Sequence, residues 1–204
     1  MCLKPYPGLA LALLFVCAAY PTLAQTAPAA TESRPSLAIG AGLSGYDPDF
    51  GHGRMYGGAL WIDYTPNMGP LLLHGIGIEA EARDLNYDRS PSQPSNLRED
   101  VIGGGVIYSW RHFRNIRPYG KFLMGYGNTD YGSNITHARY HDSRTVTSVG
   151  GGVEYRAFRS VWVRADYEYQ WWPNFFKATT PAGLLNPQGF TVGASYHFSR
   201  LYLH

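Results

Sequence analysis

Polar and apolar residues alternate with a period of two along most of the chain. In the clearest stretch, Val161, Val163, Ala165, Tyr167 and Tyr169 alternate with Trp162, Arg164, Asp166, Glu168 and Gln170. This period is typical of β-strands whose two faces meet different surroundings. The pattern predicts eight strands, at about 36–46, 55–65, 75–87, 98–110, 117–130, 143–156, 161–170 and 188–198.

Alternation alone leaves open whether the apolar face points into a core or toward lipid. A soluble lipocalin-type barrel or a sandwich turns that face inward, whereas a membrane barrel turns it outward. If both chain ends lie on one side, the aromatic residues gather at two levels. The lower level has Tyr64, Tyr108, Trp110, Tyr155, Tyr196 and Phe198, and the upper level has Tyr56, Tyr87, Tyr126, Tyr167, Tyr169 and Trp171.

Amphipathic rings favour the two headgroup boundaries of a bilayer, whereas a single core gives no reason for two aromatic levels. A bilayer also leaves unpaired backbone groups without water, so a sheet can span it only when the sheet is closed. We therefore predict an all-β protein, an eight-stranded antiparallel up-and-down transmembrane β-barrel over residues 36–198.

The amino-terminal residues predict export. Lys4 precedes an apolar run at 9–19, and small residues at 22 and 24 suit cleavage before Gln25. That run is shorter than the roughly 20 residues that span a bilayer as a helix. We predict a cleaved signal peptide (1–24), a flexible leader (25–35), the barrel (36–198) and a carboxyl-terminal tail (199–204), which places the protein in a cell outer membrane.

Both cysteines, Cys2 and Cys17, belong to the predicted signal peptide, so the mature chain has neither disulfides nor a cysteine metal site. The formal net charge is only +2 and the basic residues are scattered, which argues against nucleic-acid binding. The seven histidines do not cluster, and we expect no metal and no cofactor.

The charged residues on the polar faces of the strands would lie inside such a barrel. Both signs occur, so we hypothesise an internal ion-pair network that plugs the lumen. Its members are Glu79, Glu81, Arg83, Lys121, Glu154, Arg164, Asp166 and Glu168. His197 also falls on this face, and Asp63 and Arg156 either join the network or are solvated near the strand ends.

The last strand carries Thr191-x-Gly193-x-x-Tyr196-x-Phe198. This pattern resembles the carboxyl-terminal assembly signal of bacterial outer-membrane barrels, although six residues, SRLYLH, follow Phe198 here. From about Ser36 to Phe198 the chain resembles the outer-membrane β-barrel domain family, which includes the transmembrane domain of outer-membrane protein A, OmpX-type barrels and opacity-type surface proteins. The resemblance implies contact with outer-membrane lipid and lipopolysaccharide, recognition by the barrel-assembly machinery, and a monomer.

Four other stretches contain residue types that occur in binding or catalytic sites. Residues 40–45 match GxGxxG, but within a predicted strand and with no helix after it. His141-Asp142-Ser143 holds the three residue types of a hydrolase triad in a predicted outer loop. His197-Phe198-Ser199 resembles the His-x-Ser of lipid A 3-O-deacylase barrels, without the downstream glutamate. The aromatic stretch 171–176 is either a continuing girdle or an exposed contact patch.

These observations favour an outer-membrane barrel with a structural, adhesive or surface-interaction role, exerted through its extracellular loops on a partner that the sequence does not identify. We do not expect an enzyme. One alternative is a narrow pore for ions or small solutes, which requires an open path past the lumen charges. The other is a lipid-modifying enzyme, which requires an ordered set of His, Ser and acid at the outer rim, drawn from His141, Ser143 and His197.

Overall fold

The computed structural model describes residues 35–49, 53–66, 75–87, 95–133, 139–177 and 180–198. These residues form nine strands. The strands are β1 (Ser36–Asp47), β2 (Met55–Thr65), β3 (Ile76–Tyr87), β4 (Ser95–Ser109), β5 (Ile116–Ser133), β6 (Arg139–Arg156), β7 (Val161–Lys177), β8 (Thr180–Leu185) and β9 (Gln188–Phe198). Within these ranges there is no helix long and apolar enough to cross a membrane.

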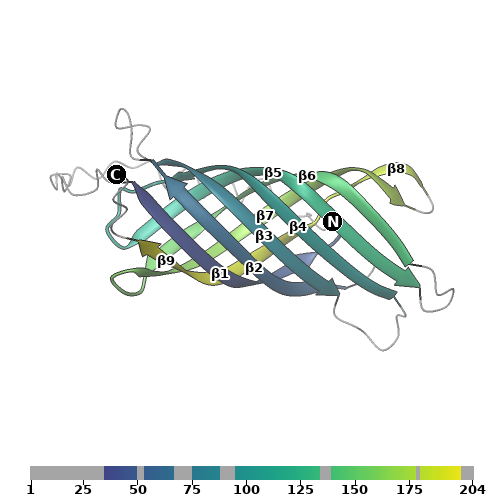
Figure 1. The fold of residues 1–204 in the computed structure, drawn as a ribbon, viewed down its shortest axis with the longest axis horizontal. Coiled ribbons are helices and arrows are strands. Elements are labelled where there is room, and N and C mark those ends of the chain that lie inside the picture. Colours follow the sequence, from purple (N-terminus) through teal and green to yellow (C-terminus); the bar gives the residue numbers. More distant parts are fainter. Residues whose placement is uncertain are drawn as a thin grey trace, which may run out of the picture. The chain divides into compact units, whose positions relative to one another are not determined.

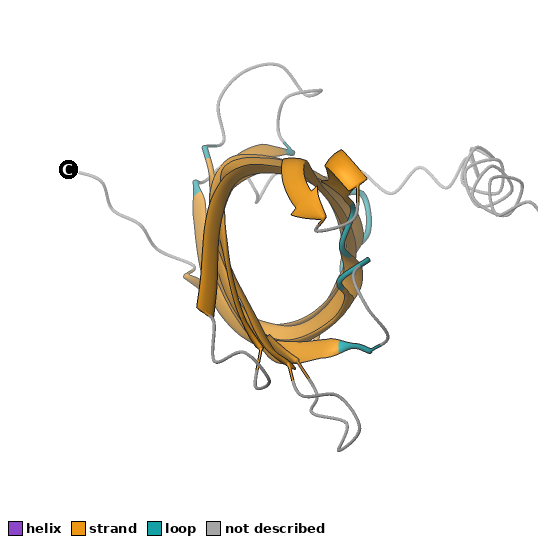
Figure 2. Cartoon of the chain, turned by 90° about the vertical axis from the view of Figure 1, so that its right-hand side faces the viewer, coloured by secondary structure: helices purple, strands orange, loops and turns teal. Residues whose placement is uncertain are grey.

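Eight of the strands close into a ring. Each pairs antiparallel with its neighbour from β1 to β7, and β9 pairs with both β7 and β1, which completes the barrel seen end-on in Figure 2. The predicted eight-stranded fold is therefore confirmed. The short strand β8 was not predicted; it pairs with the far end of β7 alone, because β7 continues to Lys177 and the chain turns back along it.

The barrel has two different ends (Figure 1). β1 begins and β9 finishes at one of them, which we call the inner end, and the connections at 110–115 and 157–160 also lie there. At the other, outer end, β4 to β7 run further than predicted. There the strands remain paired through polar residues such as Asp130 and His141. Because polar and apolar residues no longer alternate in these segments, the sequence pattern did not predict them as strands. Most of the first inner connection, 67–74, lies outside the described residues.

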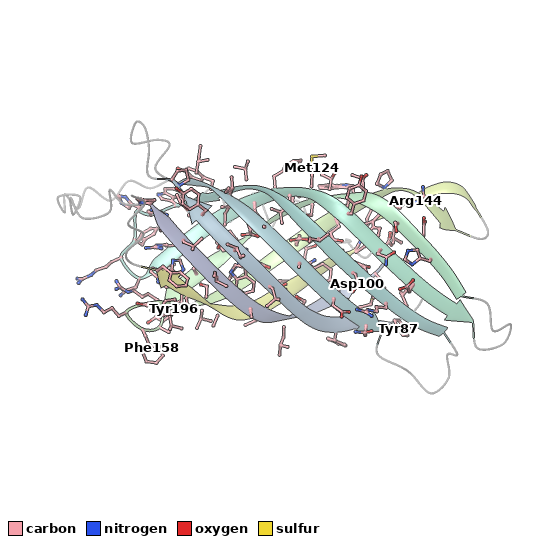
Figure 3. All side chains as sticks on the ribbon, viewed as in Figure 1. Tyr87, Asp100, Met124, Arg144, Phe158 and Tyr196 are labelled. Atoms are coloured by element: carbon pink, nitrogen blue, oxygen red, sulfur yellow. The ribbon has the colours of Figure 1, made fainter. Side chains whose placement is uncertain are left out.

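The wall and the interior have inverted polarity relative to a soluble protein. Leu43 is 77% exposed and Ile102 66% exposed on the outer face of the wall, whereas Arg164 is 1% exposed inside. Met124 points away from the barrel in Figure 3. An apolar outer surface and a charged interior are the arrangement expected of a barrel surrounded by lipid.

Outward-facing aromatic pairs mark the two ends. Tyr196 and Phe198 lie with ring centroids 4.9 Å apart at the inner end, and Tyr167 and Phe190 lie 4.9 Å apart toward the outer end. One predicted member of the upper level is wrong. Tyr87 packs inside against Tyr46, Met55 and Leu85, because odd positions of β3 face the lumen.

The seam between β1 and β9 depends on small residues. Gly40 lies against the indole of Trp61, so that a Cβ added at position 40 would overlap this ring. Arg164 in turn stacks on Trp61, 4.8 Å from the ring centroid. Space at the seam is therefore needed for an aromatic ring that supports a buried charge.

We expect Gly40→Ala to destabilise the barrel by about 1 to 3 kcal/mol, because Trp61 must move away from its position under Arg164. The measurement is urea unfolding of the chain refolded in lipid vesicles. Gly58→Ala is the matched control on the neighbouring strand, because its added Cβ has no contact closer than 3.8 Å and should change stability by less than about 0.5 kcal/mol. Equal losses in the two variants would contradict this account of the seam.

Candidate functional site

Lys121, on β5, lies at the centre of the charges inside the barrel. Its Nζ is 2.5 Å from Glu81 Oε2, 2.9 Å from Glu168 Oε2, 3.2 Å from Glu79 Oε1 and 3.5 Å from Asp166 Oδ2. Gly150 leaves the room for this side chain, since a Cβ there would lie 3.2 Å from the Lys121 Cε. One lysine thus joins carboxylates from β3 and β7, which face each other across the lumen.

Arg164, on β7, joins the same strands nearer the inner end. Its Nη2 donates to Glu79 Oε2 at 2.8 Å, its Nη1 to Asp63 Oδ2 at 3.2 Å, and its Nε to Asp166 Oδ2 at 3.0 Å. Its guanidinium lies 4.6 Å from the ring centroid of Tyr119, whose hydroxyl donates to Asp166 at 2.8 Å. This arginine is therefore surrounded by acceptors and aromatic rings.

Arg83, on β3, extends the network toward the outer end. It bonds Glu81 closely and donates from Nη1 to Glu168 Oε1 at 3.2 Å, while its guanidinium lies 4.2 Å from the ring centroid of Tyr46. The Gln170 amide donates to Glu168 Oε1 at 2.9 Å and accepts from the Trp172 indole at 2.9 Å. A continuous chain of polar contacts thus reaches the aromatic residues of the outer mouth.

At the inner end the charges are more loosely held. His197 Nε2 lies 3.8 Å from Glu154 Oε2, and Ser195 Oγ is 3.2 Å from the same nitrogen. Arg156 donates to the carbonyl oxygen of Arg159 at 3.1 Å. Of the two residues left open by the sequence, Asp63 joins the network through Arg164, whereas Arg156 belongs to the inner rim.

The structure places all eight predicted network residues inside the barrel, where each is buried. Seven of them meet in contacts around Lys121, Arg164 and Arg83, and Glu154 lies apart beside His197. Sequence reasoning missed Glu99, which is 2% exposed, and the supporting groups of Tyr119 and Gln170. Glu99 shares the odd positions of its strand with Val101 and Gly103, so the alternation already indicated that Glu99 faces the lumen. Nothing in the sequence indicates that Tyr119 binds Asp166.

Acids outnumber bases in the part of the lumen that the structure describes. Its buried carboxyl groups are Asp63, Glu79, Glu81, Glu99, Glu154, Asp166 and Glu168, and its buried bases are Arg83, Lys121 and Arg164. Among the described residues, no three His, Cys, Asp or Glu side chains are arranged to hold a metal ion. The arrangement is therefore a dense salt-bridge network in which carboxyl groups outnumber bases.

Two apolar clusters cover the network on its outer side. One contains Val146, Trp172 and Leu185, and the other contains Tyr46, Met55 and Leu85. Trp172, at 0% exposure, is thus an inward residue of β7 and not part of an exposed aromatic patch. Beside Glu81, Arg83 and Glu168 there is a cavity of about 10 Å³, which is room for about one water molecule.

The residues of the predicted assembly signal lie on both faces of β9. Thr191 is buried, and its hydroxyl is 2.8 Å from that of Ser44, while Gly193 lies against the backbone of Ala41 on β1. Tyr196 and Phe198 face outward at the inner end. Their recognition by an assembly machinery remains a prediction.

The His141-Asp142-Ser143 motif lies in β6 and not in a loop, so the predicted loop is wrong. Because side chains alternate along a strand, Asp142 faces away from its two neighbours and pairs with Arg144 at 2.9 Å. His197 faces the lumen beside Trp162, with ring centroids 5.2 Å apart, and Ser199 lies outside the described residues.

Comparison with known protein families gives one match, to the family described as "Outer membrane protein beta-barrel domain", over residues 9–198. No curated protein sequence matches the chain significantly.

Solved structures of similar fold include three outer-membrane proteins. Neisserial surface protein A has a TM-score of 0.59 and 12% identity, with 80% of this chain and 97% of that chain covered. OprG of Pseudomonas aeruginosa has a TM-score of 0.59 and 13% identity, with 82% and 97% covered. Ail of Yersinia pestis has a TM-score of 0.52 and 18% identity, with 80% and 97% covered. At these identities the similarity concerns the fold.

We expect Arg164→Met to lower the free energy of unfolding by about 3 to 5 kcal/mol, because Glu79, Asp63 and Asp166 would lose a shared buried partner. Urea unfolding in detergent measures this loss. Arg98→Met is the control, because Arg98 forms an exposed pair with Asp84 at 2.9 Å and exposed pairs contribute little. If the two substitutions shifted the unfolding midpoint equally, the lumen network would not be a source of stability.

Proposed function

Because the chain belongs to the outer membrane protein β-barrel domain family, we propose that it is an integral barrel with a structural, adhesive or surface-interaction role exerted at its outer end. Membership of this family implies a place in the outer membrane of a Gram-negative envelope. The proposed role is non-catalytic as far as the lumen is concerned, since most of the buried acids there pair with Lys121, Arg164 or Arg83 and apolar side chains cover them.

The observation that carries this proposal is the burial of paired charges inside the barrel. Lys121 and Arg164 join side chains from opposite walls, and the clusters around Trp172 and Met55 lie over them at the outer mouth. The interior of a barrel of about eight strands is just wide enough for its own side chains. A plugged lumen leaves the outer surface and the extracellular connections as the parts available to partners.

The orientation follows from the connections and the chain ends. In bacterial barrels the short turns face the periplasm and the long loops face outward. The inner end holds the turns at 110–115 and 157–160, the start of β1 and the end of β9 (Figure 1). Phe158 and Tyr196 lie at this end in Figure 3, and Tyr87, Asp100 and Arg144 lie toward the other.

Further parts of the proposal concern biogenesis and partners. A signal peptide at 1–24 would direct export, and the pattern from Thr191 to Phe198 would be recognised by the barrel-assembly machinery. The folded monomer would contact outer-membrane lipid and lipopolysaccharide through its apolar wall. Ail is named an attachment invasion protein, and one of its structures contains a heparin analogue. For this chain an attachment role is supported by the shared fold alone.

We expect the folded chain to show no conductance steps in a planar lipid bilayer, because salt bridges and apolar clusters fill the lumen. A gel shift between unboiled and boiled samples establishes that the inserted protein is folded, and a porin in the same bilayer serves as the positive control. Reproducible steps would contradict the plugged barrel and favour the narrow pore. Such a pore should then prefer cations, because buried carboxyl groups outnumber buried bases.

A further inference from the structure

Three side chains from two neighbouring strands meet on the outer wall of the barrel. His141 and Ser143 face outward from β6, and the next residue of this strand, Arg144, is labelled in Figure 3. Asp130 lies directly opposite His141 in the β5–β6 register, and its Oδ1 is 2.6 Å from His141 Nδ1. The acid beside the histidine therefore comes from the neighbouring strand and not from the sequence motif.

In space these groups follow one another as acid, histidine and serine, as in a serine hydrolase. A carboxylate holds Nδ1 of the imidazole, and Nε2 lies 3.5 Å from Ser143 Oγ. The serine hydroxyl donates to Asn128 Oδ1 at 3.1 Å. A half-turn of the Asn128 amide would free this hydroxyl for His141 and would direct an NH₂ group toward a developing oxyanion.

The depth of Ser143 suits lipid chemistry. Tyr126 is 68% exposed on the outer wall and lies opposite Thr145, while the next outward pair toward the outer end is Asn128 with Ser143. Outward tyrosines mark the headgroup boundary of the membrane. Ser143 is roughly 7 Å further along the strand toward the outer end, on the headgroup side of that boundary and beside the polar parts of outer-leaflet lipids.

A groove of about 790 Å³ on the wall leads to the serine. Its lower part is lined by Leu60, Ala82 and Ile102, and its upper part is lined by Arg98, Asn128 and Ser143. The lower part matches an acyl chain and the upper part matches a polar headgroup. An amphiphile in this groove would place its ester group beside Ser143.

We propose that Ser143, His141 and Asp130 form a lipid esterase site that cleaves an ester-linked acyl chain from a lipid of the outer leaflet. Ser143 Oγ attacks the ester carbonyl carbon while its proton passes to His141 Nε2. The ester C–O bond breaks, and the leaving alcohol takes that proton. Water then attacks the acyl-serine with His141 as base, which releases the fatty acid and restores the serine.

In this scheme Asp130 is a positioning residue that holds the tautomer and orientation of His141. The activity goes beyond the proposed surface role and does not depend on the plugged lumen. It differs from the expectation, drawn from the sequence, that the chain is not an enzyme. That expectation considered Asp142, whereas the acid in the site is Asp130.

The test measures fatty acid released by the folded chain, purified from outer membranes, from two substrates: lipopolysaccharide and dipalmitoylphosphatidylglycerol in mixed micelles. Release from either one supports the proposal and identifies the lipid class. We expect Ser143→Ala to reduce the rate roughly 1,000-fold or more. A fluorophosphonate should form an adduct on Ser143, located by mass spectrometry.

Asp130→Asn and Asp142→Asn are a matched pair of substitutions. The first should lower kcat by about 100-fold or more with KM unchanged, because it alters the tautomer of His141 without touching the lipid. The second should stay within about twofold of the unchanged chain, because Asp142 faces Arg144. The gel shift shows that each variant is folded. No release from either lipid by the folded chain, or equal release by Ser143→Ala, would overturn the proposal.

Discussion

The burial of charge inside the ring is the constraint on which the rest of this structure depends. Arg164 and Lys121 find their acids on strands far apart in sequence, with Asp63 separated from Arg164 by 101 positions. A bilayer cannot solvate these groups, so they are tolerated only when paired and hydrogen-bonded. Because the partners meet only when β2, β3, β5 and β7 are held in one ring, the ionic contacts and the closure of the sheet require each other.

Because the charges are buried inside, the inner and outer faces of the barrel wall have different roles. The inner face makes the buried contacts, such as Trp61 over Gly40 and Gln170 between Glu168 and Trp172. The outer face is then free to meet lipid, and above the aromatic level it can carry polar pairs. The continuous β5–β6 ladder sets the register across which Asp130 meets His141, and the proposed esterase site needs such a rigid support.

The sequence predicted the strands and the inward side of the charged residues, because both follow from a local period of two. It could not predict which base meets which acid, since the contact between Arg164 and Glu79 depends on how far strands shift around the closed ring. For Tyr87 the predicted outward face is wrong, although the sequence shows that Tyr87 shares the odd positions of β3 with the charged residues that face the lumen. His141 was assigned to a loop because polar strands beyond the membrane resemble loops, and its contact with Asp130 required the pairing of two strands.

The exposed wall has a consequence for how such barrels change over time. Residues like Leu43 are exposed on the outer face of the wall, where surrounding lipid would accept an apolar side chain of any shape. Substitutions there are constrained in polarity but hardly in identity, unlike those in the close-packed core of a soluble protein. Half of every strand can therefore drift while the architecture persists, which accounts for a common fold with Neisserial surface protein A at only 12% identity.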